Sequence, residues 1–262
     1  MAVLVSFLSI QVQAAPPISS SMQVEAEKLV LRKKRMEAIN LLWEPGKIKK
    51  DTPENRKLLE RISNLFLSEK AQNTYEEVLS WKRNDPTVSL DKINEALVIE
   101  PDNLLLLLEK GRLQVRKNDC EKASETLLPY TKINFPSEDL QILHFITQVC
   151  RGAKILGTNI TLPAKNKKIS PLWLLAELDH LDQTKESMKI RENLSQLEAL
   201  GYKSPQIYYW NWKLQKAAKK QDVEAARKYN QTCKNLSSSQ FREYFKDPHL
   251  CQYLGEVDEN AN

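Results

Sequence analysis

The chain has 262 residues, 28% of them charged and 41% hydrophobic, and its formal net charge at pH 7 is only +5. Its basic side chains are scattered along the sequence, which argues against a nucleic acid partner, because phosphate binding needs concentrated Lys and Arg. Only six glycines occur, and no long stretch alternates apolar and polar residues, so we expect an all-α fold.

The N-terminus differs from the rest of the chain, because no charged side chain occurs before Glu25. An apolar run from Ala2 to Ile10 precedes Val12-Gln13-Ala14, which places small or medium-sized residues where a signal peptidase reads them. We therefore expect a signal peptide over 1–14, a linker over 15–21 and a periplasmic or secreted protein. No Lys or Arg precedes the run, which leaves open an upstream start, a buried helix or an anchor. The run is too short to span a bilayer, so no stable membrane insertion is expected.

A regular spacing of prolines runs through the middle of the chain. Pro101, Pro136, Pro171 and Pro205 are almost evenly spaced, each just before an apolar segment of helical pattern. Recurrence at about 34 residues is typical of stacked helical hairpins, in which each unit buries its face only against its neighbours. Such stacks are more often binding surfaces than catalysts.

Two incomplete hairpins precede the first of these prolines. In the first, an apolar pattern runs over 26–43 with Lys33-Lys34 at the place of the turn, so either a hairpin or one continuous helix fits. In the second, a helix over 71–81 is followed by an apolar stripe over 90–97 that ends before Pro101. Both patterns favour helices that pack by one face.

The clearest unit runs from residue 103 to residue 136. Its pattern predicts an apolar helix over 104–115, a turn, and a second helix over 120–132. Small residues allow the paired helices to approach closely, and a bulky residue fills the space beside them. The residues that carry the pattern are Gly111, Asn118-Asp119, Ala123, Leu127 and Pro136.

This unit resembles a tetratricopeptide (TPR) repeat, a family in which a small residue, a Gly/Asn-Asp turn, an Ala, a large apolar residue and a Pro follow at similar spacing. Tyr130 stands where that family usually has Ala. The resemblance is specific in this unit and looser elsewhere between residues 22 and 236. It implies a right-handed superhelical stack of antiparallel helix hairpins, a TPR-like α-solenoid, with N-terminal repeats over 22–151.

After this unit the pattern changes. Residues 139–151 predict a helix, but residues 152–170 hold two glycines, a proline and a lysine-rich stretch. They predict a loop at the boundary between two groups of hairpins, with a functional loop as the alternative. Two further hairpins are expected over 171–236. Residues 237–262 are expected to form a capping helix over the end of the stack and then a frayed acidic tail.

The sequence offers few candidates for catalysis. Its three histidines, His144, His180 and His249, are far apart and form no HExxH motif. Asp179 and His180 are neighbours on a predicted helix and so point apart, which favours a solvated helix face over a metal or acid–base group. No GxSxG motif or phosphate loop occurs. We therefore expect a protein that is not an enzyme and that binds no cofactor or metal.

Four cysteines occur, and none forms a CxxC motif. An even number in an exported chain predicts two disulfides, for which three connectivities are possible. The TPR resemblance implies which one, because it brings the start of one hairpin's second helix near the end of the next hairpin's first helix. On that basis we expect Cys120 to pair with Cys150, and Cys233 to pair with Cys251.

Four of the five residues over 208–212 are aromatic, in the order Tyr-Tyr-Trp-Asn-Trp. On a helix they cannot all face one core. Either some of this aromatic surface is exposed as a binding anchor, or the C-terminal stretch of the chain packs over the excess.

The resemblance also implies a binding groove, because first helices line the concave face of TPR stacks. The predicted partner-binding residues are Leu108, Arg112, Arg116, Tyr208, Asn211, Gln215 and Lys219. An apolar groove with Arg and Lys head groups would suit an extended or helical peptide with acidic groups. The alternative is that these basic residues only form a solvated face.

These features predict an exported, non-catalytic scaffold that binds a protein or peptide in a TPR-like groove. The alternative is a cell-envelope protein that binds or processes glycans in the same groove. A pentatricopeptide RNA binder also has a repeat of similar length, but its strong basic character and an Arg-rich transit peptide are missing here.

Overall fold

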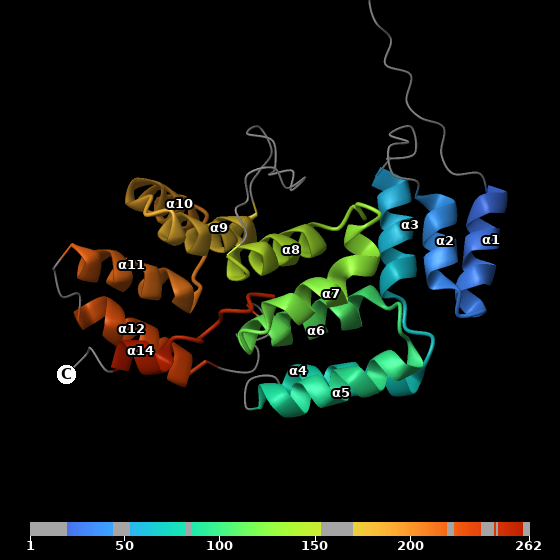
Figure 1. The fold of residues 1–262 in the computed structure, drawn as a ribbon, viewed down its shortest axis with the longest axis horizontal. Coiled ribbons are helices and arrows are strands. Elements are labelled where there is room, and N and C mark those ends of the chain that lie inside the picture. Colours follow the sequence, from blue (N-terminus) through green and yellow to red (C-terminus); the bar gives the residue numbers. More distant parts are fainter. Residues whose placement is uncertain are drawn as a thin grey trace, which may run out of the picture. The chain divides into compact units, whose positions relative to one another are not determined.

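The structure, a computed structural model, describes residues 20–43, 53–81, 85–152, 170–218, 223–236, 244 and 246–258. These residues form helices and no strand (Figure 1), which confirms the all-α prediction. The helices are α1 (Ser20–Leu31), α2 (Arg35–Leu42), α3 (Pro53–Asn64), α4 (Glu69–Trp81), α5 (Pro86–Ile99), α6 (Leu104–Arg116), α7 (Cys120–Thr131), α8 (Glu138–Cys150), α9 (Pro171–Gln183), α10 (Ser187–Ala199), α11 (Pro205–Ala217), α12 (Val223–Lys234) and α14 (Leu254–Asp258).

The chain divides into two units, residues 1–65 and 66–262, and each is described by itself. The predicted signal peptide lies outside the described residues. So does nearly all of the predicted boundary loop, of which only the end residues Gly152 and Ser170 are described. The first unit contains α1 to α3, and the second contains α4 to α14.

In the first unit, α1 and α2 form a hairpin rather than one continuous helix. Lys33 adopts a left-handed backbone with a φ of 61°. The amide of Lys34 donates to the carbonyl of Leu29 at 2.9 Å, and the amide of Lys33 donates to that of Val30 at 2.8 Å. This pair of bonds ends a helix by satisfying its last carbonyls. The turn therefore needs no glycine.

The third helix of this unit, α3, was not predicted from the sequence. It is amphipathic, it begins at Pro53, and it buries Leu59 and Ile62. The buried guanidinium of Arg35 donates to the carbonyl of Ile62 at 3.1 Å and to that of Leu65 at 2.6 Å. A cation placed on the last carbonyls of a helix satisfies them and opposes the helix dipole.

In the second unit, the regular recurrence lies in the helix starts. Helices α6, α8, α9 and α11 begin at nearly equal intervals, at Leu104, Glu138, Pro171 and Pro205. Pro171 and Pro205 are the first residues of their helices, whereas Pro101 and Pro136 precede the cap residues Asn103 and Ser137. A proline is tolerated at a helix start because its missing N–H would be unpaired there anyway. Helix starts with a proline as the first residue and helix starts with a capping residue therefore recur at the same interval.

Gly111 lies where α6 packs closely against α7 and α8. A Cβ atom at this position would lie 3.1 Å from the Cδ2 atom of Leu143 on α8 and 3.4 Å from that of Leu127 on α7. The predicted turn also forms: Asn118 has a φ of 60°, and the amide of Asp119 donates to the carbonyl of Gln114 at 2.8 Å. Adjacent helices pack in pairs as expected, while the superhelical stack stays a prediction.

Both disulfides form as predicted. Cys120 at the start of α7 pairs with Cys150 at the end of α8, with Cα atoms 5.9 Å apart. Cys233 on α12 pairs with Cys251, with Cα atoms 5.6 Å apart. The bridges close loops of 30 and 18 residues, for which the chain-entropy model gives about 3 kcal/mol of stabilisation each.

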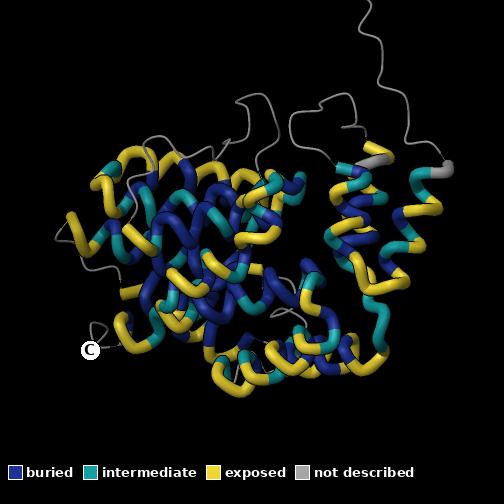
Figure 2. Tube along the Cα trace, turned by 45° about the vertical axis from the view of Figure 1, so that its right-hand side comes forward, coloured by how far each residue is buried: buried dark blue, intermediate teal, exposed yellow. Residues whose placement is uncertain are grey.

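Residues 256–258, part of the predicted acidic tail, are helical rather than frayed. Residues 246–258, called the C-terminal segment from here on, bury Leu250 and Val257, which are 1% and 0% exposed. The prediction of a frayed tail from residue 256 onwards is therefore wrong as far as residue 258. In Figure 1 this segment (red) runs back beside α12 toward α6, and in Figure 2 the buried residues of the second unit lie on the facing sides of its helices. Most of the predicted capping helix lies outside the described residues.

Candidate functional site

Two of the predicted groove residues are buried in the second unit. Leu108 and Arg112 are 2% and 3% exposed. The Arg112 guanidinium lies 3.4 Å from Glu109 and 3.7 Å from Asp139, which approaches from α8. The prediction that Arg112 offers its charge to a partner is therefore wrong, because α8 covers this face of α6 and supplies a carboxylate to it. Nothing local in the sequence indicates that approach.

A second basic groove residue, Arg116, is also used inside the chain. Its Nη2 atom donates to the carbonyl of Leu250 in the C-terminal segment at 3.3 Å. Burial lowers the pKa of Arg116, and the nearby Asp247 carboxylate acts in the opposite direction. Arg116 thus anchors the end of the chain on α6.

The groove residues on α11 have a different position. Tyr208, Asn211 and Gln215 are half-buried. Tyr208 packs against the apolar core that α9 to α12 form together. Lys219 lies outside the described residues. A partner-binding role for Tyr208, Asn211 and Gln215 stays a prediction.

The surplus aromatics of α11 are covered by the C-terminal segment, the second of the two alternatives left open by the sequence. Tyr209, Trp210 and Trp212 are buried. The rings of Tyr209 and Tyr253 stack with centroids 4.1 Å apart and planes 11° apart. The amide of Tyr253 donates to the hydroxyl of Tyr229 at 3.0 Å. The aromatic run therefore holds the chain's own end.

The C-terminal segment contacts α6, α8, α9 and α11, the helices that begin at nearly equal intervals. Besides its bond to Arg116 on α6, it places Lys246 2.8 Å from Asp139 on α8 and His249 3.4 Å from Asp179 on α9. The Nε2 atom of Gln206 on α11 donates to the carbonyl of His249 at 2.6 Å. Of the predicted groove residues, Arg116 therefore already contacts a stretch of the chain's own polypeptide.

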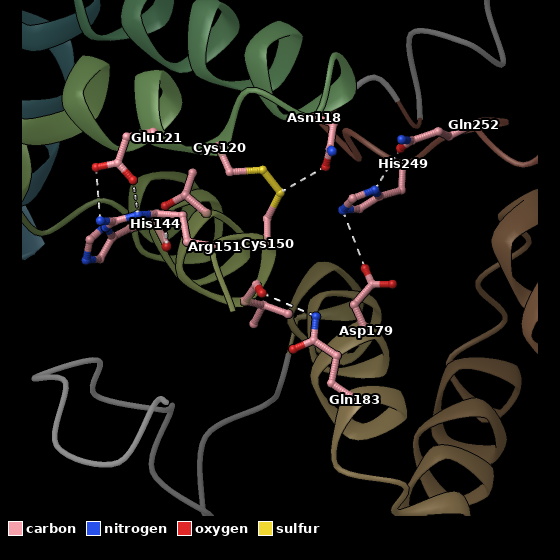
Figure 3. The surroundings of a disulfide bond; sticks show 12 residues. Asn118, Cys120, Glu121, His144, Cys150, Arg151, Asp179, Gln183, His249 and Gln252 are labelled. Carbon is pink, nitrogen blue, oxygen red and sulfur yellow. Dashed lines mark hydrogen bonds and ion pairs between the residues drawn. A yellow bond between two sulfur atoms is a disulfide. The ribbon is translucent and has the colours of Figure 1, made fainter. Parts of the chain in front are cut away.

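A cleft remains between α8, α9, α11 and this segment. It is partly open to solvent. Its apolar wall includes Ile142, Ile146, Leu175 and Trp210, and its polar groups are Asp179, Gln206, Lys246, Asp247 and His249. Figure 3 shows His249 and Asp179 pointing toward one another, in the same region as the Cys120–Cys150 disulfide.

Two acceptor atoms of the cleft residues are buried with no hydrogen-bond partner among the described residues. They are the Oδ2 atom of Asp247 and the Oε1 atom of Gln206. The other oxygen of Asp247 accepts from the amide of His249 at 2.9 Å, and the other end of the Gln206 amide is the donor described above. Each side chain is thus held in place through one atom while the other atom stays unpaired.

Burial sets the proton affinity of the two carboxylates of the cleft. It raises the pKa of Asp247, and the neighbouring His249 partly offsets this rise. Burial also raises the pKa of Asp179, against the effects of His249 and Lys213 and of a hydrogen bond from Tyr253. The cleft therefore favours carboxylates that are protonated or matched by a cation.

The sequence did not indicate this cleft. It placed Asp179 on a solvated face, and it assigned no role to Gln206, Asp247 or His249 beyond noting the isolated histidine. One feature of the sequence could have indicated the cleft. The bridge from Cys251 to Cys233 holds the neighbouring residues 247–249 close to α12, beside the aromatic run over 208–212. Among the residues that the structure describes, no group of His, Cys, Asp and Glu side chains is arranged to hold a metal ion.

The chain matches no model of a known protein family, no curated protein and no solved structure. No helix within the described ranges combines the length and the apolar character needed to cross a membrane. The function therefore has to be inferred from the side chains themselves.

Proposed function

We propose that the protein is an exported, non-catalytic scaffold that holds an extended segment of a partner protein or peptide along the first helices of its hairpins. The observation that supports this most is the C-terminal segment. Side chains of Arg116 and Gln206 donate to its backbone carbonyls, and its Leu250 is buried in a cluster with Leu236 and Tyr244. Side-chain donors on a peptide backbone, combined with pockets for apolar side chains, are a general means of peptide recognition.

The proposed compartment rests on two observations. The uncharged apolar N-terminus predicts export, and both cysteine pairs lie at disulfide distance. Disulfides persist in oxidising compartments such as the periplasm or the extracellular space, and they are rare in the cytosol. A periplasmic or secreted location is therefore part of the proposal.

The glycan alternative has less support. Sugar binding through aromatic residues would need open ring faces, but Tyr209, Trp210 and Trp212 are buried. The ammonium of Lys213 also lies 4.8 Å from the centre of the Trp210 ring. The aromatic run that could have indicated a glycan site is instead part of the core.

Peptide selection tests the proposal. The full chain would be panned against a random peptide display library, and the affinity of the selected peptides would be measured by fluorescence polarisation. We expect Gln215→Ala on α11 to weaken their binding, while Gln196→Ala, an exposed glutamine on α10, leaves it unchanged. If both substitutions changed peptide affinity equally, the binding site would not lie on α11. A library that yields no binder would contradict the proposal itself.

A further inference from the structure

We propose that the cleft between α8, α9, α11 and the C-terminal segment binds a cationic side chain, an ammonium or guanidinium group, of the partner. This inference rests on the proposed function and names the chemistry that the site recognises. It reverses the expectation of an acidic partner, because the arginines behind that expectation, Arg112 and Arg116, are engaged inside the chain.

The first argument is the excess of hydrogen-bond acceptors. Asp247 and Gln206 are 6% and 2% exposed, both line the cleft, and each has a buried oxygen without a partner among the described residues. Buried acceptors are nearly always paired in folded proteins, so such atoms call for a donor. A ligand for this cleft should therefore bring hydrogen-bond donors.

The second argument is charge. Of the bases near the cleft, Lys246 pairs with Asp139 and Lys213 pairs with Asp182, each at 2.8 Å. Arg116 donates to the carbonyl of Leu250, and its charge also acts on Asp247. The two ring nitrogens of His249 face Asp179 at 3.4 Å and the Gln252 side-chain oxygen at 2.8 Å. None of these contacts involves the unpaired oxygen of Asp247. An anion would be repelled by Asp179 and Asp247, whereas a cation would match them.

The third argument is shape. One side of the cleft is formed by Ile142, Ile146 and Leu175, and the carboxylates of Asp179 and Asp247 lie among the polar residues of the lining. Lys and Arg side chains pack their methylene stems on apolar surface and direct their charged ends to polar groups. A partly open cleft with an apolar wall and polar groups suits the end of one such side chain.

Binding should weaken as the pH falls. Protonation of Asp179 or Asp247, whose pKa values burial raises, would remove the negative charge that attracts the ligand. The other titratable groups that act on these carboxylates are Asp182, Lys213, Arg116, Tyr253 and His249. Protonation of His249 would add a competing positive charge and would act in the same direction.

The test uses small probes that differ only in one side chain, among which norleucine matches the lysine stem without its ammonium. The Nα-acetyl methylamides of lysine, arginine, norleucine and glutamate would be titrated at millimolar concentration into the ¹⁵N-labelled full chain. We expect the lysine or arginine probe to shift the amide signals of residues 246–250, and the norleucine and glutamate probes not to do so. A response to lysine alone or to arginine alone would identify the preferred head group.

Variants locate the site. Asp247→Asn keeps the oxygen that accepts from His249 and turns the unpaired acceptor into a donor, so it should weaken binding of the cationic probe about tenfold or more. Asp91→Asn, which removes the same charge from an exposed position on α5, should bind like the original chain. Equal binding to the Asp247→Asn variant, or equal shifts with norleucine, would overturn the proposal. If no probe shifted the amide signals, water alone would hydrogen-bond to these acceptors, and this result would overturn the proposal as well.

The two proposals fail separately. If peptides are selected but Asp247→Asn does not change their binding, the cation site is wrong and the scaffold function stands. If the lysine probe binds but no peptide is ever selected, the cation site stands and the peptide-binding function is wrong.

Discussion

The side chains with the largest expected effects on stability are charged residues inside the second unit. Glu109 is 0% exposed and lies against Arg112, and Asp139 on α8 is a second partner of the same guanidinium. Breaking a buried ion pair by removing one partner costs far more than the pair's net contribution, because the remaining charge stays buried. Charges in this region therefore fix the packing of α6 against α8 rather than serve as contacts for a ligand.

Arg112→Ala should lower the free energy of unfolding by about 3 kcal/mol, since Glu109 would lose a buried partner. Urea denaturation followed by circular dichroism would measure the change. Lys122→Ala provides the control, because that ammonium is exposed and its pair with Asp119 is a surface contact. Its unfolding curve should overlay that of the original chain. An Arg112→Ala curve that also overlays it would show that the guanidinium is not structural.

Asp247→Asn should stabilise the protein at neutral pH by about 1 kcal/mol, because it removes a buried carboxylate with an unpaired oxygen. The folded state raises the pKa of Asp247, so its contribution to stability is fully present below the unfolded value of about 3.9 and is lost as the pH rises through the folded value. The advantage of the variant should therefore be absent near pH 4 and should grow toward pH 7. Urea denaturation across this range would measure it, and parallel stability curves for the two proteins would contradict the expected cause.

Among the elements, the C-terminal segment depends most on long-range contacts. Its α14 has only five residues, too few to be stable without partners. The segment is held by the Cys233–Cys251 bridge, by the stacking of Tyr253 on Tyr209 and by donors from α6 and α11. Its order should therefore follow the state of that bridge.

The double variant Cys233→Ser/Cys251→Ser should lose about 3 kcal/mol of stability, and hydrogen exchange should become faster at the amides of residues 246–258. The matched variant Cys120→Ser/Cys150→Ser should lose a similar amount without this local effect, because its bridge joins α7 to α8. Exchange measured by mass spectrometry on both variants distinguishes the two bridges. Unchanged exchange in the C-terminal peptides of the first variant would show that noncovalent contacts alone hold the segment.

Gly111 tests the packing of α6 between α7 and α8. In Gly111→Ala the higher helix propensity of Ala, worth about 1 kcal/mol, opposes the close contact of a Cβ atom with Leu143 at 3.1 Å. The stability should therefore stay near that of the original chain. Gly111→Leu should cost about 1–3 kcal/mol, because the larger side chain overpacks the same contact. Chemical denaturation of both variants checks this, and a well-tolerated leucine would mean that α8 can move away from α6.

For the whole molecule, the prediction concerns processing and compartment. The exported protein should begin near Ala15 and carry both bridges, because the N-terminal apolar run has the pattern of a signal peptide. N-terminal sequencing of material from outside the cytoplasm, with mass mapping of non-reduced peptides, would show both features. Intact Met1 on a cytosolic protein with free thiols would be the opposite result.

The sequence predicted most of the helices and several of their turns, and the pairing of the cysteines was predicted only with the help of the TPR resemblance. Helix starts depend on signals within a few residues, such as Asn103 as a cap and Pro205 as a first residue, so they can be read locally. The bridge between Cys120 and Cys150 followed from neighbouring hairpins. The hairpin of α1 and α2 stayed open because its turn has a lysine where the left-handed backbone usually selects glycine or asparagine.

Only the tertiary structure decided where the charges and the end of the chain lie. The bond from Arg116 to Leu250 joins residues 134 positions apart, and the bond from Gln206 to His249 joins residues 43 positions apart. Periodicity shows which face of a helix is apolar, but not which distant segment covers it. The C-terminal segment lies against the predicted groove at Arg116, and the cleft beside it holds acceptors as well as basic groups. The positions of these charged and polar groups depend on which distant segments pack together, and no local sequence pattern predicts this.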